Sequence, residues 1–138
     1  MTVNPYLSFE GRCEEAIEFY KRAVGAEVQM LMRFKEMPAG ACAEGKSTPG
    51  TENKIMHASL QIGDSIVNAS DGRCTGNTSF GGISLSLAAA NDAQAQKVFT
   101  ALSNGGQVTM PLGKTFFSSS FGMLTDRFGV SWMVIVQA

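Results

Sequence analysis

The sequence predicts an α+β protein built from two copies of one βαβββ module, each a strand, a helix and three further strands. The first observation is a repeat, because a pattern of apolar and small residues returns 80 positions later in the chain. A second echo has a shorter offset of 66 and relates Gly63 to Gly129 and Ile66 to Trp132. The offset changes because the first copy carries an extra stretch, Lys35 to Asn53. The residues of the longer echo are Phe19, Gly25, Ala26, Val28 and Met30 against Phe99, Gly105, Gly106, Val108 and Met110.

The elements of the first copy follow from hydrophobic periodicity and stop signals. Alternating side chains predict a strand over Val3–Phe9, and helical spacing predicts a helix over Arg12–Val24 that ends at Gly25. Three more strands are predicted over residues 28–34, 54–62 and 65–69, the last two joined by a hairpin turn at Gly63-Asp64. We therefore place the first repeat at about residues 1–72.

The second copy shows the same order. A strand over residues 82–87 precedes a helix that we expect to be capped by Asp92 and stopped at Asn104-Gly105-Gly106. Strands are predicted over residues 107–110, 119–125 and 130–136, with a turn from Asp126 to Gly129 between the last two. This repeat spans about residues 78–138. Because a half of 60 to 70 residues is marginal alone, we expect a single domain over residues 1–138.

Composition excludes several classes of protein. The net charge is −1 with scattered Lys and Arg, which disfavours nucleic-acid binding, and no apolar run approaches the ~20 residues of a membrane span. The N-terminus does not resemble a signal peptide, so we expect a cytoplasmic protein. Three cysteines without CxxC spacing argue against a disulfide framework or zinc knuckle. Cys13 lies on the apolar stripe of the first predicted helix, which favours packing over chemistry.

The strand faces give the first functional hint. Met56, Ala58, Leu60 and Ile62 form an apolar face suited to packing against a helix, and the alternate residues form a mixed face. If the apolar faces pack on helices, the other faces line a concave polar surface. The alternative is a solvated sheet face. The polar residues expected on this surface are Tyr6, Ser8, His57, Ser59, Gln61, Ser84 and Ser86.

Four short motifs together resemble the PhnB-like branch of the vicinal-oxygen-chelate superfamily, the relatives of glyoxalase I, bleomycin-resistance proteins and extradiol dioxygenases. The resemblance runs over essentially the whole chain. It implies a cupped eight-stranded mixed sheet with helices on the outside, as in glyoxalase-like proteins, usually completed as a homodimer. The motifs are Pro5-Tyr6-Leu7-x-Phe9-x-Gly11, Glu15-Ala16-x-x-Phe19-Tyr20, His57-Ala58 and Asp126-Arg127-Phe128-Gly129-x-x-Trp132.

The resemblance also implies metal ligands, but this chain departs from that pattern. The corresponding positions are Asn4, Val67 or Asn68, Gly82 and Met133, and none is a histidine or carboxylate. Neutral amides bind divalent ions weakly, and a thioether suits copper rather than zinc, nickel or iron. We therefore expect no tightly bound divalent ion and no cofactor. Some relatives carry a methyltransferase label, but the chain lacks the glycine-rich turn of a doubly wound sheet that a methyl-donor cofactor usually needs.

The candidate site centres on His57, the only histidine of the chain and the one candidate for a catalytic residue. It is either a general base or ligand anchor, or a half-buried strand residue bonded to a backbone carbonyl. Four aromatic residues either form an apolar wall or are divided between the core and dimer contacts, namely Phe116, Phe117, Phe121 and Trp132. The ligand-binding residues we expect are Tyr6, Ser8, His57, Ser59, Gln61 and Trp132, with no metal.

Two further features stay open at this point. Arg127 is either an anion clamp or a solvated turn residue. The Lys35–Asn53 loop is a lid, a dimer arm or merely a mobile loop. Three functions fit the sequence: a metal-independent small-molecule-binding protein, as bleomycin-resistance relatives are; a lyase, isomerase or dioxygenase-type enzyme with a relocated site using His57; and a dimeric scaffold without a ligand.

Overall fold

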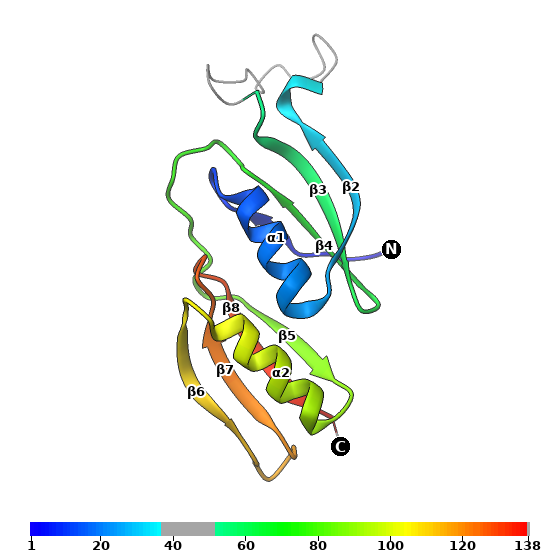
Figure 1. Ribbon diagram of the computed structural model, residues 1–138, viewed down its shortest axis with the longest axis vertical. Coiled ribbons are helices and arrows are strands. Elements are labelled where there is room, and N and C mark those ends of the chain that lie inside the picture. Colours follow the sequence, from blue (N-terminus) through cyan, green and yellow to red (C-terminus); the bar gives the residue numbers. More distant parts are fainter. Residues whose placement is uncertain (37–51, 138) are drawn as a thin grey trace. The chain divides into compact units, whose positions relative to one another are not determined.

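The computed structural model describes residues 1–36 and 52–137, and it divides into two compact units, Met1–Thr78 and Ser79–Ala138. Over its described residues, each unit contains one α-helix and four strands in the order β-α-β-β-β, which confirms the predicted α+β fold class (Figure 1). The first unit has β1 (Tyr6–Ser8), α1 (Cys13–Val24), β2 (Glu27–Arg33), the short 3-10 helix η1 (Phe34–Glu36), β3 (Ile55–Ile62) and β4 (Ser65–Ser70). The second unit has β5 (Ser84–Ala89), α2 (Asp92–Ser103), β6 (Gln107–Gly113), β7 (Phe121–Thr125) and β8 (Ser131–Val136).

The eight strands form two four-stranded mixed sheets, one in each unit. The first sheet has the order β1-β4-β3-β2 and the second the order β5-β8-β7-β6. In each sheet the first strand of the unit pairs in parallel with the last, and the remaining pairs are antiparallel. One face of each sheet packs against the helix of its own unit, and the other face is called here the helix-free face.

Helix α1 is amphipathic and is held at its start by a carboxylate from another element. Arg12 occupies the N-cap position but its side chain makes no capping hydrogen bond. Instead Asp71, directly after β4, accepts hydrogen bonds from the backbone N–H groups of Gly11 at 3.0 Å and Cys13 at 2.7 Å. The other oxygen of Asp71 accepts from the N–H of Ile55 at 2.7 Å. One buried side chain therefore joins β4, β3 and the start of α1, and it satisfies donors that a helix start leaves unpaired.

Burial of the apolar stripe of α1 against the first sheet supports the packing role predicted for Cys13. This thiol is fully buried beside Ala16, and burial together with the charge of Asp71 raises its pKa. Because the thiolate is the reactive form, the Cys13 thiol is unreactive at neutral pH.

We therefore expect iodoacetamide at neutral pH to leave Cys13 unmodified in the folded protein and to label it fully after denaturation. Cys74, which is only partly buried, is the internal comparison. Peptide mass spectrometry after timed quenching measures both sites. Labelling of Cys13 as fast as that of Cys74 would show that α1 opens readily.

Helix α2 corrects one expectation about its start. The N-cap is Asn91 rather than Asp92: Asn91 Oδ1 accepts from the N–H of Gln94 at 2.8 Å. The side chain of Gln94 accepts from the N–H of Ala90 at 2.6 Å, which completes a reciprocal capping arrangement. The carboxylate of Asp92 instead accepts from the hydroxyls of Ser119 and Ser120, and these bonds lower its pKa.

The strand ends also differ from the predicted ones. β1 covers only Tyr6–Ser8, because Val3 is exposed and makes no strand pairing, whereas β6 extends to Gly113. β5 begins at Ser84, two residues after Gly82, which has a positive φ of 79°. A backbone in that conformation leaves the extended strand geometry. The remaining predicted helices and strands agree with the structure to within one or two residues.

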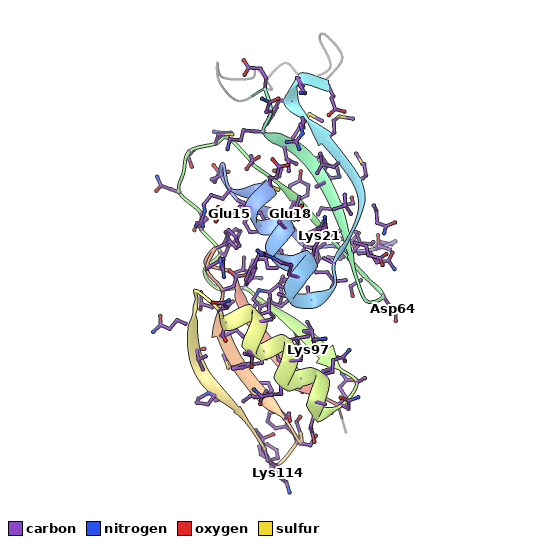
Figure 2. The ribbon with its side chains drawn as sticks, viewed as in Figure 1. Glu15, Glu18, Lys21, Asp64, Lys97 and Lys114 are labelled. Carbon is purple, nitrogen blue, oxygen red and sulfur yellow. The ribbon has the colours of Figure 1, made fainter. Side chains whose placement is uncertain are left out.

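The outer surface of each helix is polar. Figure 2 shows Glu15, Glu18 and Lys21 on α1 and Lys97 on α2, while Asp64 lies in the turn between β3 and β4. Within the described part of the chain, neither helix has the length and apolar character needed to cross a membrane.

Candidate functional site

The helix-free face of the first sheet brings together polar side chains from three adjacent strands. Strand alternation buries Ala58 and Leu60 of β3 on the helix side and directs His57 and Ser59 to the other side. The pairing register then places Asn68 of β4 opposite both Ser59 and Tyr6. A row of polar residues therefore crosses β1, β4 and β3.

Tyr6 and His57, 51 residues apart in the sequence, are in direct contact. The Tyr6 hydroxyl lies 3.1 Å from His57 Nδ1, and the two ring centroids are 5.5 Å apart. Tyr6 is 51% exposed and His57 is half-buried, so Tyr6 is the more accessible residue of the pair. The hydrogen bond of His57 Nδ1 is thus made to a side chain, whereas the alternative given in the sequence analysis was a bond to a backbone carbonyl.

Ser59 and Asn68 extend the contact on the other side of the imidazole. Ser59 Oγ donates to Asn68 Oδ1 at 2.7 Å and lies 3.5 Å from His57 Nε2, near the outer limit of a hydrogen bond. We call Tyr6, His57, Ser59 and Asn68 the polar row. Met30 and Met32 of β2 pair with Ser59 and His57 and flank the row with apolar surface.

Asn68 is the member of the polar row that the sequence argument missed as a binding residue. The sequence did contain the information needed. In a hairpin with a two-residue turn at Gly63-Asp64, the residues on either side of the turn pair with each other, and pairing continued away from the turn places Ser59 opposite Asn68. The contact between Tyr6 and His57 has no such signal, because a parallel register between β1 and β4 is not set by a connecting turn.

The other predicted residues of the first unit share the face but not the contacts. Ser8 lies on β1 two residues from Tyr6, and the structure gives it no hydrogen bond to the polar row. Gln61 donates to the backbone carbonyl of Gly63 at 3.1 Å, so its amide is directed to the hairpin turn. The prediction that these two residues bind a ligand stays a prediction.

Trp132 does not lie on a helix-free face. It is 3% exposed, packs in the core of the second unit, and donates from Nε1 to Asp126 Oδ2 at 2.9 Å. It pairs with the buried Leu124, and the next residue, Met133, faces the other side. The expectation that Trp132 lines the binding surface is therefore wrong, because its indole N–H is satisfied by a buried carboxylate on the helix side.

The alternation of side chains along the strands also corrects the second sequence repeat, which has an offset of 66 and relates Ile66 to Trp132. Ile66 is partly exposed on the helix-free face of the first sheet, whereas Trp132 is buried on the helix side of the second. The position that matches Trp132 in facing is Val67, which is buried. Val67 and Trp132 are 65 positions apart, so the offset of 66 taken from the turn glycines is one residue too long for residues that face the same way. The turn between β7 and β8 is also longer than that between β3 and β4.

The helix-free face of the second sheet is mostly apolar. Met110, Met123 and Met133 pair in one row across β6, β7 and β8, and Ser86 continues this row on β5. Phe121 lies on the same face, in an edge contact with Phe117 at a centroid distance of 5.1 Å. Phe116 is fully exposed. Ser84 and Ser86 are exposed on this face, as predicted from alternation.

Of the two features left open by the sequence, the structure places Arg127 but only the ends of the Lys35–Asn53 loop. The Arg127 guanidinium donates twice to the carbonyl of Asn104, at 3.0 and 3.1 Å, so it braces the end of α2 and is not free to clamp an anion. Most of the Lys35–Asn53 loop, including Cys42 and Glu44, lies outside the described residues. At its ends, Lys35 and Glu52 are joined by a backbone hydrogen bond of 3.0 Å.

The residues at the implied metal positions do not fit a divalent ion. Val67 is buried on the helix side, so Asn68 is the side chain that faces outward, and its oxygen already accepts from Ser59. Gly82 offers no ligand, and Met133 offers a thioether. Over residues 1–36 and 52–137 no three His, Cys, Asp or Glu side chains gather as a metal site would require.

We accordingly expect purified protein to hold less than one-tenth of an equivalent of zinc, nickel, iron or manganese after dialysis, on the order of the background that non-ligating side chains leave. Elemental analysis by plasma mass spectrometry measures this directly. About one equivalent of any of these metals retained per chain would contradict the expectation.

The fold places the protein in a class: two βαβββ units, each with a mixed sheet and one helix, define a glyoxalase-like α+β protein. The family model described as 3-demethylubiquinone-9 3-methyltransferase matches residues 1–135. The protein belongs to this PhnB-like family.

Individual relatives agree with this assignment. The YjdN protein of Escherichia coli K12 is 37% identical over 142 residues, which cover 99% of this chain and 95% of that protein. The crystal structure of PA1353 from Pseudomonas aeruginosa is 38% identical with a TM-score of 0.84, covering 99% of this chain and 98% of that chain. A Bacillus cereus PhnB protein, described as a 3-demethylubiquinone-9 3-methyltransferase, is 28% identical with a TM-score of 0.80 and 99% coverage of both chains.

Proposed function

We propose that this protein binds a small organic molecule on the helix-free face of the first sheet, with Tyr6 and His57 as its polar contacts and no metal ion. The observation that supports the proposal most directly is the 3.1 Å contact between the hydroxyl of the exposed residue Tyr6 and the only imidazole of the chain. Ligand sites combine apolar surface with a few converging polar groups, and here Met30 and Met32 flank the polar row.

Native mass spectrometry of protein purified under mild conditions tests the proposal, because it detects a co-purifying small molecule by its mass. We expect His57→Ala to weaken binding of that molecule by about 1–3 kcal/mol, the usual cost of leaving a buried polar partner unpaired. Gln96→Ala, on the exposed surface of α2, is the matched control and should bind as the wild type does. Equal affinity of His57→Ala and wild type would remove His57 from the site.

The family description names a methyl transfer, but the observed topology argues for binding instead. Each sheet is a four-stranded mixed βαβββ sheet, whereas methyl-donor cofactors usually bind at a glycine-rich turn of a doubly wound parallel sheet. Calorimetric titration with S-adenosylmethionine separates the two readings. Binding of S-adenosylmethionine at micromolar concentration would favour the methyltransferase reading.

The Tyr6–His57 pair also favours a second candidate, a proton-transfer enzyme of the lyase or isomerase kind. An imidazole within hydrogen-bond distance of a phenol is an arrangement that general acid-base catalysis uses. Incubating the protein with its co-purifying molecule and following that molecule's mass or isomer composition separates catalysis from binding. Conversion that is lost in His57→Ala would establish the enzyme.

We further propose that the protein assembles as a homodimer. The exposed side chains Met110, Phe116 and Phe117 leave apolar surface on the second unit that a second copy would cover. We expect light scattering at micromolar concentration to give about twice the chain mass of 14.7 kDa. Replacing Phe116 and Phe117 together with serine should shift the protein toward monomer, and a monomeric wild type would contradict the proposal.

A further inference from the structure

The hydrogen bonds of the polar row have a direction, and Ser59 reveals it. A serine hydroxyl carries one proton, and the short 2.7 Å bond to Asn68 Oδ1 uses it. Ser59 Oγ can then only accept from His57 Nε2 across the longer 3.5 Å separation. This arrangement favours the neutral imidazole with its proton on Nε2, because a bare Nε2 would face an oxygen lone pair of Ser59.

The position of this proton also determines how His57 Nδ1 bonds to the Tyr6 hydroxyl. With the proton on Nε2, His57 Nδ1 has a lone pair and accepts the proton of the Tyr6 hydroxyl at 3.1 Å. The phenol proton is thus committed to His57, and the free lone pairs of the Tyr6 oxygen are directed away from the ring. Tyr6 is 51% exposed, so a ligand can reach its side chain, and the hydroxyl oxygen would meet that ligand as a hydrogen-bond acceptor.

We propose that Asn68, acting through Ser59, fixes the tautomer of His57 and thereby makes the Tyr6 oxygen an acceptor, so that the site selects ligands that present an N–H or O–H donor. Asn68 is a positioning residue, and Tyr6 is the group that contacts the ligand. The selectivity rests on the proposed function, whereas the tautomer does not. The reverse direction, with Asn68 donating to Ser59, would place the imidazole proton on Nδ1 and turn the Tyr6 hydroxyl outward as a donor.

The tautomer can be read without any ligand. His57 is the only histidine, so protein labelled with 15N-histidine and prepared without a histidine tag gives ring-nitrogen signals from His57 alone. At a pH where the imidazole is neutral, we expect Nε2 to be the protonated nitrogen and Nδ1 the bare one. A protonated Nδ1 in the wild type would overturn the proposal.

Two substitutions separate positioning from simple packing. Asn68→Leu removes the acceptor for Ser59, whose proton is then free to bond Nε2, so we expect the Nδ1-protonated form to increase several-fold. Asn68→Asp keeps an acceptor at the same place and should retain the wild-type tautomer. If Asn68→Leu leaves the tautomer unchanged while the protein stays folded, Asn68 is not the positioning residue.

Ligand selectivity is tested with phenol and anisole, which have similar shapes and differ in the hydroxyl donor. Titration of each against the His57 ring signals should give at least fivefold tighter binding of phenol, and Tyr6→Phe should abolish the difference. Equal affinities would overturn the selectivity and leave the proposed function intact. If neither compound binds and no co-purifying molecule is found, the proposed function fails, and the tautomer result stands on its own.

Discussion

Replacing Asp71 with alanine is expected to lower the free energy of unfolding by about 4 kcal/mol, because it leaves three backbone donors without a partner. Asp71 is 1% exposed and accepts from the N–H groups of Gly11, Cys13 and Ile55. Each orphaned buried donor costs about 1–3 kcal/mol, and water reaches the Gly11 end most easily because that bond is only part-buried. The expected loss in the free energy of unfolding is therefore smaller than the full cost of three buried donors without partners.

Chemical denaturation followed by circular dichroism measures this loss. Asp71→Asn is informative, because its one carbonyl oxygen can keep the bonds from Gly11 and Cys13 while its amide N–H₂ opposes the N–H of Ile55. We expect it to fall between the wild type and Asp71→Ala. Glu18→Ala is the control, since the Glu18–Lys21 pair is exposed and contributes less than about 1 kcal/mol. A similar small effect for Asp71→Ala would show that α1 and β3 do not depend on this carboxylate.

Local patterns in the sequence were sufficient for the elements but not for this junction. Periodicity located α1 and the alternation of β3, including the placement of His57 and Ser59 on the face opposite the buried Ala58. Asp71 carries no comparable signal, because an aspartate followed by glycine after a strand is typical of any turn. Its role depends on the folded chain bringing the end of β4 to the start of α1.

The site shows the same division between local and long-range information. Tyr6, His57 and Ser59 were predicted from alternation within single strands, and Asn68 followed from the hairpin register once a two-residue turn is assumed. Trp132 was misplaced because β8 is apolar on both faces, with Val134 on one side and Met133 on the other. Alternation of polar and apolar residues therefore cannot tell which face of β8 packs against the helix. The hydrogen bond from the Trp132 indole to Asp126 holds the indole in the core, and it depends on the turn between β7 and β8.

Gly106→Ala is expected to destabilise the protein by about 3 kcal/mol, through steric overlap with the backbone. A Cβ atom at this position would lie 2.2 Å from the carbonyl oxygen of Thr125 and 2.9 Å from backbone atoms of Asp126. Neither contact can be relieved by rotating a side chain, so β6 must move away from β7. That movement would also disturb the pairing of Gln107 with Thr125.

The matched control for this prediction is Gly113→Ala at the far end of β6. A Cβ at Gly113 meets nothing within 4 Å, so the substitution reduces only the freedom of the unfolded chain and should change stability by less than about 1 kcal/mol. Thermal and urea unfolding of both variants give the comparison. Both substitutions add one methyl group, at Gly106 directly before β6 and at Gly113 at its end. The difference between their free energies of unfolding therefore measures the cost of the close approach of Gly106 to the end of β7. Equal stabilities of the two variants would mean that this approach is looser than the structure shows.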